Sequence, residues 1–202
     1  MKRTILSVLS VFALIAFSGG AAADCPSKRD LKSGIRLERS SPLLISAFTQ
    51  ARNSPAFTEK RTQSINGRTE NKTTTYLNAL MPTVLKNDRG TFEFAYGQDL
   101  SSKIKALRRG PLTTALTLLV NGKQTNTGRF TLTFIQESSV KIGQCRYKTW
   151  VVKAEHFLNG RGTNPFVQHY SPELGISLGA IKLDADGTPL TSVEFDRIST
   201  VK

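Results

Sequence analysis

The stretch 129–134, Arg-Phe-Thr-Leu-Thr-Phe, alternates polar and apolar residues along its whole length. In an extended chain its two phenylalanines and its leucine point to one side, and the arginine and two threonines point to the other. Such alternation predicts an antiparallel strand with one buried face and one face in water. The same pattern recurs at 91–96, 115–120 and 192–196. We therefore expect several strands of this kind.

Dipeptides that favour tight hairpins separate the alternating segments. They are Asn66-Gly67, Asn121-Gly122, Asn159-Gly160 and Asp186-Gly187. Both residues of such a pair accept the positive φ angles that a two-residue hairpin requires. The pattern predicts a mainly β protein built as a single antiparallel β-sheet domain, and it leaves a half-barrel, a barrel and a sandwich open.

One short helix is expected near residues 99–109. Leu100, Ile104 and Leu107 have helical spacing, an aspartate precedes them as a cap, and a Gly-Pro pair follows as a stop. A second, weaker helix or an irregular segment is expected over 46–56, which two prolines bracket.

The first residues have the features of a secretory signal peptide. A basic start, Met1-Lys2-Arg3, leads into an apolar run from Ile5 to Phe17. Small residues follow up to Ala23, as signal peptidase requires before its cleavage site. The run is shorter than the roughly 20 residues that a membrane-spanning helix needs. We expect residues 1–23 to be cleaved after Sec-type export, leaving 24–202 as one β-rich periplasmic domain with no transmembrane span.

Two cysteines, Cys25 and Cys145, are present. In an exported protein an even number of cysteines favours a disulfide. This bond would join the start of the exported chain to its middle. The alternative is a reactive or redox thiol, but neither cysteine belongs to a Cys-x-x-Cys motif or has a histidine beside it.

The charge is strongly positive and unevenly distributed. The chain has 28 basic and 15 acidic residues, a net charge of +13, and +11 without residues 1–23. Residues 151–202 carry −1, so the excess lies before them. The densest group is Lys103, Lys105, Arg108 and Arg109. Export and the lack of a binding motif argue against nucleic acid. Anionic envelope lipid, lipopolysaccharide or a cell-wall component fits better, and a merely solvated surface is the alternative.

No catalytic, metal-binding or cofactor-binding pattern is readable. His156 and His169 lack metal spacing, and there is no nucleophile elbow or phosphate loop. We expect no cofactor, no metal and no catalytic residue. A hydrolase of an envelope polymer is the alternative function. A histidine beside Asp184, Glu173 or a free Cys145 in one pocket would support it.

The last third of the chain carries a family resemblance. Residues 137–145, Glu-Ser-Ser-Val-Lys-Ile-Gly-Gln-Cys, precede a Tyr-Ser-Pro-Glu-Leu-Gly corner at 170–175 and a strand that ends in Ile181-Lys182-Leu183. This region resembles a loose group of bacterial periplasmic β-proteins, some of them similar to the envelope-integrity proteins of alphaproteobacteria. The resemblance implies an envelope role and supplies no catalytic residues. We interpret the corner, with its proline and glycine, as structural.

The sequence thus predicts a non-enzymatic envelope-maintenance protein that binds an anionic or lipidic ligand. The basic group at 103–109 would contact the anion. The candidate apolar lining is Phe92, Phe94, Phe130, Leu132 and Phe134. The alternative for this set is an ordinary hydrophobic core.

Overall fold

The computed structural model describes residues 25–51 and 53–201. Its strands form one 13-stranded antiparallel sheet, in which each strand from β1 to β12 pairs with the next along the chain. The strands are β1 (Ile35–Arg39), β2 (Leu44–Gln50), β3 (Phe57–Ile65), β4 (Arg68–Asn78), β5 (Met81–Asn87), β6 (Gly90–Tyr96), β7 (Leu112–Val120), β8 (Lys123–Ile142), β9 (Cys145–Leu158), β10 (Gly162–Ser171), β11 (Ile176–Leu183), β12 (Pro189–Val193) and β13 (Arg197–Thr200), with 3-10 helices η1 (Lys28–Lys32) and η2 (Ser101–Arg109). The predicted fold class, one mainly antiparallel β-sheet with one short helix near 99–109, is confirmed.

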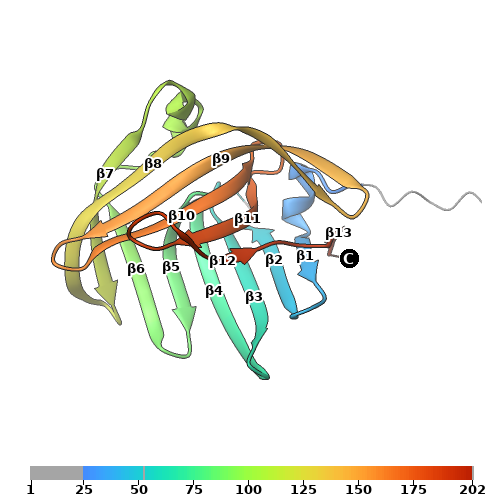
Figure 1. Ribbon diagram of the computed structural model, residues 1–202, viewed down its shortest axis with the longest axis horizontal. Coiled ribbons are helices and arrows are strands. Elements are labelled where there is room, and N and C mark those ends of the chain that lie inside the picture. Colours follow the sequence, from blue (N-terminus) through green and yellow to red (C-terminus); the bar gives the residue numbers. More distant parts are fainter. Residues whose placement is uncertain (1–24, 52, 202) are drawn as a thin grey trace, which may run out of the picture.

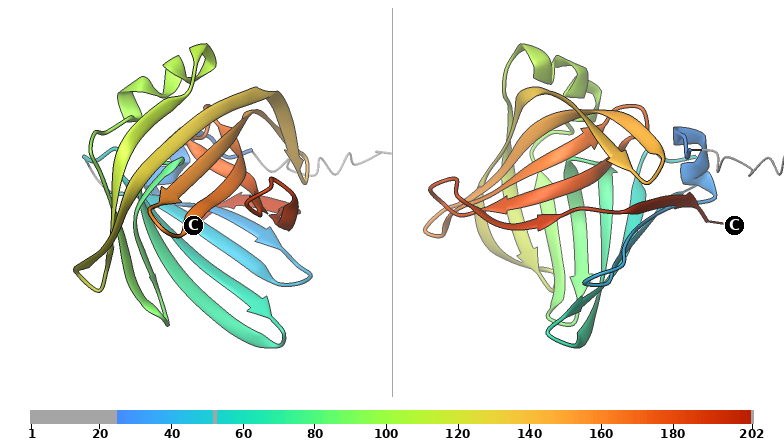
Figure 2. Two further views of the ribbon diagram at one scale, coloured as in Figure 1. Left: turned by 60° about the vertical axis from the view of Figure 1, so that its left-hand side comes forward. Right: turned by 45° about the vertical axis from the view of Figure 1, so that its right-hand side comes forward.

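The sheet rolls up so that its two halves face each other. In Figure 1, β8 and β9 arch over the molecule while β10, β11 and β12 run across the first strands, and Figure 2 shows this from two further sides. β12 pairs with β11 at one edge of the sheet, whereas β13 pairs with β1 at the other edge. Only residues 194–196 connect β12 to β13. Because three residues span about 10 Å at most, the two edges lie close together, and the open sheet forms a rolled half-barrel.

The predicted turns join consecutive strands. Asn66-Gly67 and Asn121-Gly122 are two-residue turns. The φ angles are 50° at Asn66 and 74° at Gly67, and 51° at Asn121 and 76° at Gly122. The other two pairs do not form the expected two-residue turns: Asn159-Gly160 begins a three-residue loop between β9 and β10, and Asp186-Gly187 lies in a five-residue loop between β11 and β12. A further glycine, Gly128, allows close approach of β8 to β9, because a Cβ there would lie 1.8 Å from the carbonyl oxygen of Phe157.

Of the two helical predictions, the one near 99–109 is confirmed and the one over 46–56 is partly wrong. η2 buries Ile104 and Leu107, and Asp99 accepts a 2.7 Å bond from the Ser101 N–H at its start. The prediction for 46–56 is wrong over 46–50, where β2 pairs with both β1 and β3, whereas residues 51 and 53–56 are irregular, as one of its alternatives has it. The inward positions of β2 include the polar Ser46, so the alternation of apolar residues is interrupted there.

Two hydrophobic clusters stabilise the rolled sheet. One gathers η1, β1, β2 and the β8–β9 hairpin, and the other gathers η2 with β7, β8 and β9. Tyr170 packs against both clusters. The corner after it is structural, as expected: Leu174 is fully buried, Gly175 has a φ of 76°, and the Gly175 N–H donates to the Ser171 carbonyl.

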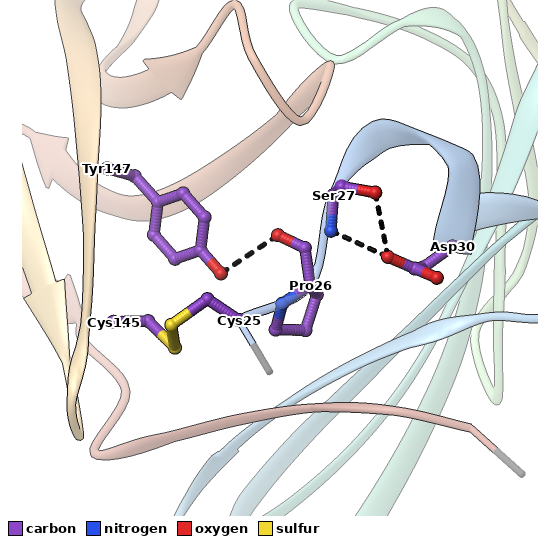
Figure 3. Close-up of a disulfide and its surroundings, with 6 residues drawn as sticks. All are labelled: Cys25, Pro26, Ser27, Asp30, Cys145 and Tyr147. Carbon is purple, nitrogen blue, oxygen red and sulfur yellow. Dashed lines mark hydrogen bonds between the residues drawn. A yellow bond between two sulfur atoms is a disulfide. The ribbon is translucent and has the colours of Figure 1, made fainter. Parts of the chain in front are cut away.

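The N-terminal segment is tied to the middle of the chain. Cys25 and Cys145 form the predicted disulfide, and the Tyr147 hydroxyl donates a 3.0 Å bond to the Pro26 carbonyl (Figure 3). Asp30 in η1 accepts bonds from the Ser27 N–H and hydroxyl. A disulfide of this kind points to an oxidising, extracytoplasmic location.

Two other expectations concern membranes. The expected signal peptide, 1–23, lies outside the described residues. Within 25–51 and 53–201, no helix combines the length and apolar character needed to cross a bilayer.

Candidate functional site

A cavity of about 380 Å³ lies between the two halves of the sheet. β2 to β6 and one residue of β7 supply one wall, and β9 to β12 supply the other. The larger apolar side chains in the lining are Phe48, Phe57, Leu85, Phe92, Phe94, Leu118, Leu158, Phe166, Val193 and Phe195. This volume falls in the range of small-molecule sites, which are mostly apolar with a few polar groups that orient the ligand.

The charged residues of the cavity lie on β3 and β4. The two-residue turn at 66–67 places Glu59 opposite Thr74 and Arg61 opposite Lys72. Since side chains alternate along a strand, these four residues share the inward face of the hairpin. All four line the cavity.

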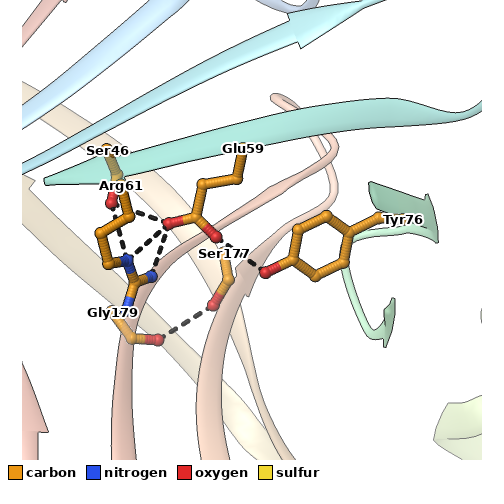
Figure 4. Close-up of polar contacts among 6 residues, drawn as sticks. All are labelled: Ser46, Glu59, Arg61, Tyr76, Ser177 and Gly179. Atoms are coloured by element: carbon orange, nitrogen blue, oxygen red, sulfur yellow. Dashed lines mark hydrogen bonds and ion pairs between the residues drawn. The ribbon is translucent and has the colours of Figure 1, made fainter. Parts of the chain in front are cut away.

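Glu59 is the centre of a buried hydrogen-bond network (Figure 4). Its carboxylate, 1% exposed, accepts 2.7 Å bonds from the Ser46 and Tyr76 hydroxyls and pairs with Arg61 at 2.6 Å. Burial alone would raise the pKa of Glu59. Arg61, Lys72 and the two hydroxyls outweigh burial and hold that pKa below its usual value. Glu59 is therefore ionised and fully partnered.

Lys72 is in a different position. It is partly buried, and no carboxylate lies within ion-pair distance of it among residues 25–51 and 53–201. Burial first, and the nearby Arg61 second, lower the pKa of Lys72 to about 8. Near neutral pH the ammonium is still protonated. The cavity wall thus carries one carboxylate and two cations, and Arg61 is already paired.

His156 contributes a neutral imidazole to the same cavity. Its ring lies 5.3 Å from the Phe94 ring and 4.6 Å from the Phe130 ring, measured between centroids. Its buried Nε2 has no hydrogen-bond partner among the described residues. Burial lowers the pKa of His156 to about 4. The ring is therefore neutral near pH 7 and offers an unused polar atom.

The pKa of His156 predicts a loss of stability in acid. Between pH 6.5 and pH 4 the unfolded chain binds a proton that the folded protein does not, so the free energy of unfolding falls as the pH falls. The loss should reach about 3 kcal/mol. Denaturant unfolding at pH 7 and pH 4 should show it in the wild type and show a smaller loss in His156→Phe. An equal loss in both proteins would contradict the assignment.

The structure separates the predicted apolar residues into two groups. Phe92 and Phe94 line the cavity. Phe130 and Leu132 are fully buried in the cluster that includes η2, and Phe134 packs against that cluster and the edge of Trp150. These last three belong to the core and not to the cavity lining.

The predicted basic group lies on η2 and does not line the cavity. Lys103, Lys105, Arg108 and Arg109 are all exposed. Lys103 donates to Gln98, while Arg108 pairs with Glu137 at 2.6 Å and lies 5.8 Å from the centre of the Trp150 ring.

The arrangement that would have supported a hydrolase does not form in the part of the chain that the structure describes. Cys145 is in the disulfide. The buried Nε2 of His156 and Nδ1 of His169 have no hydrogen-bond partner there. Those residues also contain no group of three or more His, Cys, Asp or Glu side chains that could hold a metal ion.

Sequence reasoning missed Glu59, Arg61, Lys72 and Tyr76. A signal was available, because the Asn66-Gly67 turn determines which residues of the hairpin face each other. Counting outward from it places all four on one face. This face was overlooked because charged residues take the positions where a buried strand normally has apolar ones.

We compared the chain with protein-family models, with curated proteins and with solved structures, and none of them matches it. The site is therefore interpreted from its own chemistry.

Proposed function

We propose that this is an exported periplasmic protein with a non-enzymatic, envelope-maintenance role, which binds an envelope amphiphile whose head carries an acidic group inside the rolled sheet. The acyl chain of the ligand occupies the apolar part of the cavity, and its acidic group lies at the β3–β4 wall. The net charge of +11 without residues 1–23 favours approach to anionic envelope surfaces. The resemblance to periplasmic envelope proteins stays a prediction.

The observation that carries this proposal is the unequal charge of a mostly apolar cavity. Arg61 is held by Glu59, whereas Lys72 faces the same space without a carboxylate partner among residues 25–51 and 53–201. A partly buried cation without a partner is costly, and an opposite charge reduces that cost. A carboxylate or phosphate of the ligand beside Lys72 would supply this opposite charge. The phenylalanines beyond Lys72 suit a hydrocarbon chain, since burial of each methylene contributes about 0.8 kcal/mol.

Binding of myristate, a single-chain fatty acid, tests the proposal by isothermal titration calorimetry. We expect the wild type to bind myristate most tightly when Lys72 is protonated. The affinity should fall about tenfold as the pH rises through about 8. Lys72→Gln should bind about tenfold more weakly at pH 7 and lose this pH dependence.

Lys60→Gln is the matched control. Lys60 lies next to Glu59 and Arg61 on β3 but is exposed and does not line the cavity. The Lys60→Gln substitution removes the same charge as Lys72→Gln and should leave the affinity for myristate, and the pH dependence of that affinity, unchanged. The proposal fails if myristate does not bind, or if the two lysine variants weaken binding equally.

A further inference from the structure

A second, more polar pocket continues the cavity toward the hairpin ends. Its volume is about 400 Å³, and it shares Lys72 and Leu85 with the inner cavity. The inward residues of β4 lead from one to the other: Thr74 lines the inner cavity, Lys72 lines both, and Glu70 lines the outer pocket. On the opposite wall, Ala180 of β11 lines the inner cavity and Lys182 lines the outer pocket. A ligand whose chain fills the inner cavity would place its head group in the outer pocket.

The outer pocket contains charges of both signs. Lys72, Arg89 and Lys182 are its cations, and Glu70 and Asp88 are its carboxylates. No ion pair joins any two of these five within the part of the chain that the structure describes. Among the described residues, the carboxylate of Glu70 accepts only a 3.2 Å bond, from the Gln63 amide. Both signs are therefore available to a ligand.

These charges discriminate between head groups. A simple carboxylate or a phosphate would meet the cations but would bring a negative charge toward Glu70 and Asp88. A head group that carries an amine beside its phosphate matches both sets, because charge-assisted hydrogen bonds to each sign are the strong ones. Like charges brought together without compensation reduce affinity.

We infer that the ligand is a single-chain amphiphile with a zwitterionic phosphate–amine head group, bound with its phosphate at Lys72, Arg89 and Lys182 and its amine at Glu70 and Asp88. This inference rests on the proposed function and adds the chemistry of the head group. Only the outer pocket decides between this ligand and a fatty acid, since both use the inner cavity in the same way.

Three myristoyl probes test the inference by isothermal titration calorimetry, with the protein purified after export. They are myristate, myristoyl lysophosphatidylglycerol and myristoyl lysophosphatidylethanolamine, each used below its micelle concentration. We expect the ethanolamine lipid to bind about tenfold more tightly than the glycerol lipid, because only the former carries an amine. Equal affinities for these two lipids, with myristate bound, would overturn the inference and leave the proposed function standing. If myristate does not bind, the proposed function fails, and the inference that rests on it fails too.

A double variant locates the preference. Glu70→Gln with Asp88→Asn should abolish the tenfold preference for the amine without lowering the affinity for myristate. The matched control is Glu173→Gln with Asp186→Asn, which makes the same charge change at exposed residues outside both pockets. It should keep the preference. A preference that survives in the pocket variant, or disappears in the control, would overturn the inference.

Discussion

Replacing Cys145 with serine is expected to lower the free energy of unfolding by about 3–5 kcal/mol. The disulfide closes a loop with a sequence separation of 120, and long loops lose the most chain entropy when they are cross-linked. It also anchors η1, whose Leu31 is part of the hydrophobic cluster beside β1 and β2. For a domain of this size the change corresponds to a fall in Tm of about 10 °C, which thermal unfolding followed by circular dichroism would measure.

The double variant Cys25→Ser with Cys145→Ser controls for the thiol that the single variant leaves free. It should lose the same stability as the single variant, and so should the wild type after reduction. If the single variant melts at the wild-type temperature, the disulfide does not stabilise the fold.

Replacing Glu59 with glutamine is expected to cost about 3–5 kcal/mol, because it leaves the charge of Arg61 buried without its partner. The side chain of Arg61 is only 16% exposed, and Lys72 would then repel it without a carboxylate between them. The Tyr76 hydroxyl would also lose its ionised acceptor. Equilibrium unfolding in urea would measure the change in stability.

Two further variants separate the buried charge from the general effect of removing an acidic residue. Glu137→Gln breaks the Arg108–Glu137 pair, whose side chains are 53% and 60% exposed, and should cost less than about 1 kcal/mol. Glu59→Leu with Arg61→Met replaces both charges by apolar groups and should recover most of the lost stability. If the double variant is no more stable than Glu59→Gln, the penalty does not come from an unpaired charge.

The strands were predictable where the alternation of apolar residues is regular. Over 129–134 and 91–96 the inward positions are apolar, and the structure has β8 and β6 there. β2 was missed because one of its inward residues, Ser46, is polar and bonds to Glu59, so the strand lacks a regular alternation of apolar residues. The residues of the candidate site therefore weaken the pattern by which their own strands are recognised.

The position of the site could not be predicted for a different reason. Its charged residues lie within one hairpin, whereas the opposing wall comes from β9 to β12, about 80 or more residues further along the chain. No periodicity in the sequence states how far a sheet curls before its halves meet. The same limit explains why Phe130 and Leu132, which share the alternation of Phe92 and Phe94, are in the core and not in the cavity lining.

The sequence by itself determined the antiparallel sheet, its two-residue turns at 66–67 and 121–122, and the cysteine pair. The sheet and the turns depend on local backbone geometry, and the pairing follows because the chain has two cysteines. The three-dimensional structure alone decided that the sheet rolls into a half-barrel, that an apolar cavity stays open inside it, and that Lys72 faces this cavity while the basic residues of η2 do not. These features depend on the twist accumulated over thirteen strands and on contacts between distant segments. Short-range patterns do not contain that information.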